Sequence, residues 1–148
     1  MASIRSRIGE KMKDRYLFKA KRIDNGEWVI GFYVRVNESD FICTRQLIHG
    51  RLYTVSKSFK VDPSTICQCT GLKDKNGQKI WENDILVAHL DEKFPEDETY
   101  EQVIWHESGF CTMEKNSTDC EPLDGFDTRY FAVCGNIFDN AELLERKE

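Results

Sequence analysis

Short alternating segments joined by tight-turn residues constrain this chain more than any other feature of its sequence. Residues 15–23 alternate, with Tyr16, Phe18 and Ala20 on one side of an extended backbone. Residues 24–26, Asp-Asn-Gly, then tolerate the positive φ angles that a tight hairpin turn requires. The return segment has an apolar residue at every second position: Trp28, Ile30, Phe32, Val34 and Val36. The pattern predicts a β-hairpin at the start of the fold.

The same pattern continues to the C-terminus. Further strand-like segments cover residues 41–48, 52–61, 64–72, 84–90, 102–114 and 130–138, with turns at His49-Gly50, at Asn76-Gly77 and near residues 107–109. The acidic segment 91–101 is expected to be an exposed loop. Helical character is confined to one short turn through Leu143 and Leu144, which Asp139 or Asn140 can cap. We therefore predict a mainly β fold with a short C-terminal helical turn.

A length of 148 residues allows one ordinary domain or two very small ones. We predict two β units that share one core, over residues 12–66 and 67–148. Residues 1–11 are interpreted as a disordered extension, because Met12 stands just before the first convincing strand. No apolar run approaches the roughly 18 residues of a membrane span, and the N-terminus lacks the apolar region of a signal peptide. A cytoplasmic protein is expected.

Six cysteines are present, at positions 43, 67, 69, 111, 120 and 134. Without a signal peptide, reduced thiols are expected in place of a disulfide framework. Cys67 and Cys69 share one face of a strand, but structural zinc sites favour two ligand pairs, each separated by two to four residues. We therefore predict no metal and no cofactor.

Charge divides the chain into a basic and an acidic part. Residues 1–60 carry 13 Lys/Arg and 6 Asp/Glu, whereas residues 61–148 carry 8 and 20. A basic part can bind nucleic acid, can meet the acidic part of a neighbouring copy, or can simply be solvated. The candidate binding surface consists of Arg15, Lys19, Lys21, Arg35, Arg45 and Arg51, with Tyr33 as an adjacent stacking residue.

Three motifs in order carry a resemblance to a known family. They are "VDPSTICQCTGLKDKNGQKIWENDIL" at residues 61–86, "VIWHESGF" at 103–110 and "VCGNIFDNAELL" at 133–144. Together they closely resemble the YopX family of phage and prophage proteins. The resemblance implies an N-terminal antiparallel β unit joined to a C-terminal SH3-type β-barrel, with no known enzymatic activity. The chain departs from the family pattern at Cys69, where Tyr is usual, and at Asn83, where Gly is usual.

The residues of these motifs are interpreted as architecture. Asp84 is expected to accept backbone N–H bonds where the chain turns into a strand, and a carboxylate fixed in this way is a poor general acid or base. The proposed structural residues are Gly71, Asn76, Gly77, Trp81, Asp84, Gly135 and Asn136. No local motif joins a nucleophile to a base, so no catalytic residue is predicted.

These observations favour a non-enzymatic binding or assembly module, of the phage accessory type, that forms homo-oligomers. Complementary charge on the two parts of the chain and exposed strand edges are the reasons to expect self-association. A phage or host protein is a further candidate partner. The alternative is a nucleic-acid-binding protein that uses the basic N-terminal part, and a small hydrolase is the third hypothesis.

Overall fold

The computed structural model describes residues 14–48, 51–89, 98–125 and 127–145, with the backbone alone for 45–48, 51–56 and 127. The predicted extension, residues 1–11, lies outside this range, as do His49 and Gly50. The mainly β prediction is confirmed. The chain divides into two compact units, Met1–Cys69 and Thr70–Glu148. The division falls within a strand, whereas the sequence placed it before residue 67.

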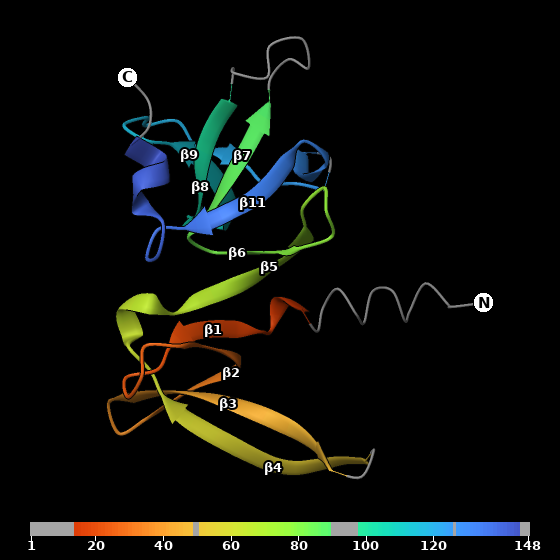
Figure 1. Cartoon of the computed structure of the whole chain (residues 1–148), viewed down its shortest axis with the longest axis vertical. Helices are drawn as coiled ribbons and strands as arrows, with labels where there is room; N and C mark the ends of the chain where they lie inside the picture. Colours follow the sequence, from red (N-terminus) through yellow and green to blue (C-terminus); the bar gives the residue numbers. More distant parts are fainter. Residues whose placement is uncertain (1–13, 49–50, 90–97, 126, 146–148) are drawn as a thin grey trace, which may run out of the picture. The chain divides into compact units, whose positions relative to one another are not determined.

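The first unit begins with four antiparallel strands (Figure 1). They are β1 (Phe18–Lys21), β2 (Trp28–Val36), β3 (Ser39–Ile48) and β4 (Arg51–Lys60). The sheet has the order β4-β3-β2-β1-β5-β6, where β5 is Cys67–Lys73 and β6 is Lys79–Trp81. The predicted hairpin is confirmed: Gly26 has a φ of 73° and its N–H donates to the Arg22 carbonyl at 2.9 Å.

The core of the first unit lies on one face of this sheet. Ala20, Ile42 and Val61 are buried there, and Phe18, Val29, Tyr33 and Ile66 pack against them. Side chains alternate between the two faces of a strand. Since Val29 and Tyr33 point to the core, the even-numbered residues of β2 lie on the opposite face. The apolar face that the sequence predicted for residues 28–36 therefore exists, but much of it is exposed, with Ile30 at 51% and Val36 at 50%.

A short 3-10 helix, η1 (Pro63–Thr65), follows β4 and precedes β5. Asp62 caps it, because its carboxylate accepts from the Ser64 N–H at 3.0 Å and from the Ser64 hydroxyl at 2.8 Å. The Thr65 hydroxyl oxygen accepts a hydrogen bond from the Lys21 N–H in β1 at 2.8 Å.

The second unit contains a five-stranded antiparallel sheet with the order β10-β9-β8-β7-β11. Its strands are β7 (Asp84–His89), β8 (Glu98–His106), β9 (Gly109–Glu114), β10 (Glu121–Pro122) and β11 (Phe131–Asn136), with 3-10 helices η2 (Asp127–Arg129) and η3 (Ala141–Glu145). Ile80, Leu86 and Val103 form its core, against which Leu72, Phe110, Leu123, Phe131 and Val133 pack. The predicted C-terminal helical turn is confirmed as η3.

Two expectations for the second unit differ from the structure. The SH3-type closed barrel is not seen in the described strands, which form an open sheet with β10 and β11 at its edges. Strand β10 is only two residues long and ends in Pro122, which has no N–H to donate to a further strand. The prediction of a loop over 91–101 is wrong for Glu98 to Glu101, which belong to β8. Residues 91–97 lie outside the described chain.

In the described part of the chain, no helix has the length and apolar character needed to span a membrane.

Candidate binding face

The sheet of the first unit leaves a strip of apolar side chains exposed along β2. Ile30, Phe32, Val34 and Val36 are 51%, 37%, 39% and 50% exposed, and their alternate positions put them on the same face. Trp28 continues this strip at the start of the strand and is half-buried. Four neighbouring exposed apolar residues on one strand differ from scattered surface residues, which are normal in soluble proteins.

Lysines border this strip on the β1 side. In the antiparallel register Lys19 lies opposite Ile30 and Lys21 opposite Trp28, so both lysines share the face of the strip. The Lys19 Nζ lies 4.7 Å and the Lys21 Nζ 5.4 Å from the centre of the Trp28 ring. Both are cation–π distances. Lys19 and Lys21 therefore contact Trp28, the aromatic residue at one end of the strip.

Strands β3 and β4 complete the face on the other side. Phe41 lies opposite Val34, and Cys43 lies opposite Phe32. On β4, Lys60 lies opposite Phe41 and Ser58 opposite Cys43, with the Cys43 Sγ 3.3 Å from the Ser58 Oγ. We define the open face as Lys19, Lys21, Trp28, Ile30, Phe32, Val34, Val36, Phe41, Cys43, Ser58 and Lys60. It has an apolar centre and lysines on both borders.

The structure brings together only part of the predicted basic surface. Lys19 and Lys21 belong to the open face. Arg35 has the parity of Tyr33 and lies opposite Asp40, so it belongs to the other face of β2. Arg15 is exposed and has a helical conformation, before β1 begins. The side chains of Arg45 and Arg51 lie outside the described residues.

Tyr33 is not the stacking residue that the sequence suggested. Its hydroxyl donates to the Asp40 carboxylate, and its ring centre lies 5.7 Å from that of Phe18 on the core side. The bond to Asp40 raises the pKa of Tyr33 above its ordinary value, and burial adds to that effect. Lys60 and Phe41 could not be assigned to this face from the sequence, because their membership of it depends on strand register.

The turn after β5 is organised by a carboxylate that the sequence analysis did not single out. Asp74 is 6% exposed, and its Oδ1 accepts from the N–H groups of Asn76 and Gln78 at 2.9 and 2.8 Å. Its Oδ2 accepts from the Val133 N–H at 2.9 Å. Gly71 and Gly77 have φ angles of 82° and 81°, which favour glycine. Asn76 and Gly77 thus form a turn held by Asp74.

Asp84 has the structural role that its motif predicted. It is 2% exposed, and its Oδ2 accepts from the Trp81 N–H at 2.8 Å. Trp81 is itself buried, at 6% exposure. Carboxylates held in this way by backbone donors serve the fold, and proton transfer would break the bonds that hold them.

The end of β11 is a second architectural site. Val133 and Gly135 flank an irregularity in the pairing with β7, and a Cβ on Gly135 would lie 2.5 Å from the Asn140 Oδ1. That oxygen accepts from the Asn136 N–H at 3.2 Å. The Asn136 Oδ1 in turn accepts from the N–H groups of Phe138 and Asp139, both at 2.9 Å.

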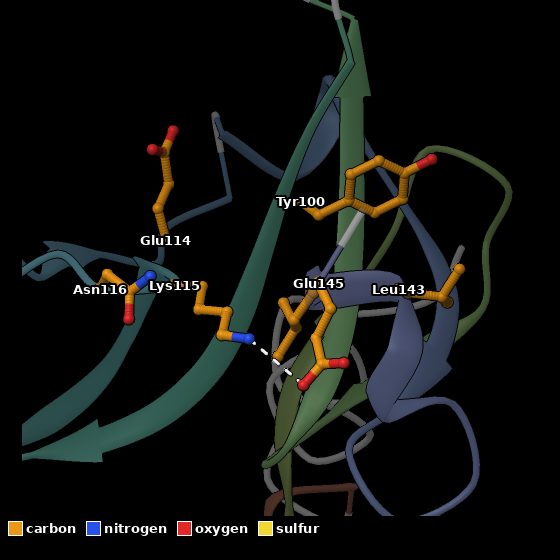
Figure 2. A pocket seen from close by; sticks show the side chains of 7 residues that line it. Tyr100, Glu114, Lys115, Asn116, Leu143 and Glu145 are labelled. Atoms are coloured by element: carbon orange, nitrogen blue, oxygen red, sulfur yellow. Dashed lines mark hydrogen bonds and ion pairs between the residues drawn. The ribbon is translucent and has the colours of Figure 1, made fainter. Parts of the chain in front are cut away.

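The described part of the second unit has exposed histidine–glutamate contacts and a pocket. The His89 Nε2 lies 3.7 Å from the Glu98 Oε1, and the His106 Nε2 lies 3.8 Å from the Glu107 Oε1. A pocket of about 250 Å³ lies beside η3 (Figure 2). In the described ranges, no group of three or more His, Cys, Asp or Glu residues is arranged to hold a metal ion.

The sequence of motifs places the chain in a family. The family model described as "YopX protein" matches residues 17–145. The chain belongs to the YopX family. Its fold is similar to the crystal structure of protein EF1440 from Enterococcus faecalis, with a TM-score of 0.57 over 86% of this chain and 96% of that one. At 23% identity this likeness concerns the fold alone. No curated protein matches the chain significantly.

One departure of this YopX protein from the family pattern is accommodated by its backbone. Asn83, where Gly is usual, has a φ of 69°, in the left-handed region that Asn tolerates better than most residues. Its Oδ1 accepts from the Gln102 Nε2 at 3.0 Å, and its N–H donates to the Val103 carbonyl at 2.7 Å. The asparagine therefore adopts the glycine-type conformation and adds a side-chain bond to β8.

Proposed function

We propose that this YopX-family protein is a non-enzymatic assembly module that self-associates through the open face of its first unit. The observation that carries the proposal is the strip Ile30, Phe32, Val34 and Val36, whose side chains are between 37% and 51% exposed. Removal of such apolar surface from water is the main favourable contribution to most protein association. A phage or prophage setting, as the family resemblance implies, is part of the proposal.

A second copy of the chain is the partner that the charge distribution favours. Residues 1–60 are basic and residues 61–148 are acidic, so the basic part of one copy can meet the acidic part of another in addition to the contact between the strips. The open face has an apolar centre and lysines on both borders, which matches the apolar core and polar rim of protein interfaces. When the strips of two copies pack together, the lysines remain at the rim, where solvent screens their charge.

The carboxylates of the motif region support a non-enzymatic role. Asp74 and Asp84 are the buried acids of that region, and both accept bonds from backbone N–H groups. A general acid or base must exchange its proton during a reaction, which these bonds oppose. Asp74 and Asp84, the acids that would be the first candidates for a catalytic loop, therefore have a structural role.

The open face also supports a second candidate function, the binding of single-stranded nucleic acid. The specific observation is that Lys19 and Lys21 share a face with the rings of Trp28, Phe32 and Phe41. Single-strand binding proteins combine basic residues with aromatic rings on which bases stack. The mostly aliphatic strip between these rings fits protein association better, so we place this function second.

A matched pair of substitutions tests self-association. Ile30 lies on the open face and Ile23 in the turn after β1, and they are 51% and 57% exposed. Size-exclusion chromatography with light scattering should give the wild type a mass above that of one chain. Ile30→Asp should weaken association at least tenfold, whereas Ile23→Asp should leave it unchanged. A wild type that is monomeric at all protein and salt concentrations would refute the proposal.

The nucleic-acid candidate has its own readout. Labelled single-stranded DNA and RNA are titrated with the full chain over a range of salt concentrations, since phosphate contacts make affinity fall linearly with salt on logarithmic axes. Binding that is lost in Lys19→Glu/Lys21→Glu but kept in Ile23→Asp would move this function to first place. Absence of binding at low salt would remove it.

A further inference from the structure

We propose that Cys111 and Cys120 form a dithiol that closes to a disulfide when the protein meets a low-molecular-weight disulfide. The pairing of β9 with β10 brings the two residues together: Pro122 lies opposite Cys111 and Glu121 opposite Thr112. Cys120 stands one residue before β10. Its side chain therefore has the parity of Cys111 and a diagonal position on the same face of the ribbon.

The two thiols are also electrostatic neighbours. After burial, the proximity of the Cys111 thiol is the next cause that raises the pKa of Cys120. Cys111 is buried at 8% exposure, and Cys120 is half-buried. Diagonal neighbours in an antiparallel ribbon lie roughly 7–8 Å apart, whereas the Cα atoms of a disulfide lie about 4.4–6.8 Å apart. Closure therefore needs rotation of both side chains and a movement of the backbone that carries Cys120 toward β9. All six cysteines are free thiols in the structure.

Other thiols are engaged with oxygen atoms. The Cys67 thiol donates to the Thr65 carbonyl and the Cys134 thiol to the Ile85 carbonyl, both at 3.3 Å. Cys43 has the Ser58 hydroxyl as its neighbour at 3.3 Å. The Cys111 thiol has a longer contact of this kind, 3.9 Å to the Gly109 carbonyl oxygen. What distinguishes Cys111 and Cys120 is that each has the other as a neighbour on the same face of the β9–β10 ribbon.

The chemistry is thiol–disulfide exchange in two steps. The Cys120 thiolate attacks one sulfur of the small disulfide, which gives a mixed disulfide on Cys120 and releases one small thiolate. The Cys111 thiolate then attacks the Cys120 Sγ, which forms the Cys111–Cys120 bond and releases the second small thiolate. The protein loses two hydrogen atoms, and one small disulfide becomes two small thiols. An excess of small thiol reverses both steps.

The disulfide would constrain one wall of the pocket beside η3. Glu114, Lys115 and Asn116 lie in the segment between the two cysteines, and Figure 2 shows them on the side opposite Leu143 and Glu145. The Lys115 Nζ pairs with the Glu145 Oε1 at 3.3 Å across this pocket. Closure of the 111–120 loop therefore restricts the residue that connects β9 to η3. This site is independent of the open face and of self-association.

Tryptic mapping tests the proposal, because Lys115 lies between the two cysteines. The full-length protein is incubated with oxidised glutathione, the remaining thiols are blocked with N-ethylmaleimide, and the protein is digested without reductant. Cleavage after Lys93, Lys115 and Arg129 separates Cys111 and Cys120 into peptides 94–115 and 116–129. A single species that contains both peptides, lacks two hydrogen atoms and separates on reduction is the expected result.

Two variants make the outcome decisive. Cys120→Ser should abolish the linked species, and Cys134→Ser should leave its yield unchanged, since Cys134 lies in the next tryptic peptide. Glutathione that stays on Cys120, linkage of either peptide to the one that contains Cys134, or complete blocking of both thiols would each overturn the proposal.

Discussion

The carboxylate of Asp74 accepts a hydrogen bond from the Val133 N–H at 2.9 Å, between residues 59 positions apart in the chain. The same carboxylate holds its own turn through the N–H groups of Asn76 and Gln78. One buried side chain therefore fastens the turn after β5 to the strand β11.

We expect Asp74→Ala to destabilise the second unit by about 3 kcal/mol, because three backbone N–H groups lose their acceptor and buried donors without a partner cost about 1–3 kcal/mol each. Urea unfolding measures the change. Asp119→Ala is the control, since Asp119 is exposed, and it should change stability by less than about 0.5 kcal/mol. Equal effects of the two variants would show that Asp74 has no special role.

Gly31 is required by the close approach of two strands. A Cβ at this position would lie 2.2 Å from the Cys43 carbonyl oxygen, which is backbone and cannot move aside cheaply. Gly31→Ala should therefore cost roughly 3 kcal/mol or unfold the first sheet. Gly109→Ala is the matched control, because nothing lies within 4 Å of its Cβ and the loss of chain entropy should make it neutral or slightly stabilising. Thermal unfolding of both variants distinguishes the two cases.

Oxidation of the Cys111–Cys120 pair should accelerate with pH. Burial, followed by the hydrogen bond to Cys111, raises the pKa of Cys120 to about 11, so the thiol is protonated at neutral pH. Only the thiolate attacks a disulfide, so the rate should rise about tenfold for each pH unit between about pH 7 and pH 10. The rate is obtained by quenching the reaction at intervals and measuring the amount of the linked peptide in each sample. A plateau near pH 8.5 would mean that a thiol with an ordinary pKa attacks first.

The oxidised protein should also resist unfolding more strongly than the reduced protein. In the chain-entropy model, a disulfide across a loop of about ten residues stabilises the native state by about 2–3 kcal/mol. Urea unfolding of the glutathione-treated protein, with and without reductant, measures the difference. In Cys120→Ser the two curves should coincide, and any remaining difference would come from another cysteine.

The cap of η1 should be visible in an acid titration. The Ser64 hydroxyl, and then the Ser64 N–H, hold the pKa of Asp62 below its ordinary value of 3.8. Because the folded-state pKa is lowered, the cap stabilises the protein above the unfolded pKa, and this contribution is lost as the pH falls through the folded value. NMR titration should give a midpoint below 3.8 for Asp62, and Ser64→Ala should raise it. Ser58→Ala should leave the midpoint unchanged.

The hairpins could be predicted from sequence because their determinants are local. Gly26 and Gly77 each have positive φ angles at the turns where their residue types suggested them. Asp84 was likewise predictable, since its backbone donor is the nearby Trp81. The bond from Val133 to Asp74 was not, because it depends on how β11 pairs with β7.

The face of β2 that is buried could not be inferred from alternation alone. The even-numbered residues form the more apolar face, yet the core takes Val29 and Tyr33. Gly31 allows the close approach of β3 on this side, and the Asp40 carboxylate satisfies the Tyr33 hydroxyl. A strand face that contains a glycine and a polar side chain can thus be buried when the neighbouring strand approaches closely at the glycine and the polar atom has a hydrogen-bond partner. The alternation of apolar residues in the sequence gives no information on either condition. The basic surface was only partly predictable for the same reason, because parity placed Arg35 on the face away from Lys19 and Lys21.

The division of the chain within β5 limits how the protein can change by recombination. The Cys69 N–H donates to the Leu17 carbonyl at 2.9 Å, and the next residue, Thr70, donates its hydroxyl to the Ile80 carbonyl at 2.8 Å. A single inserted residue between them would turn every later side chain of the strand to the opposite face. Insertions of two residues would restore the parity. The two units are therefore not exchangeable cassettes, and gene fusions between relatives should succeed only where the crossover conserves the register of this strand.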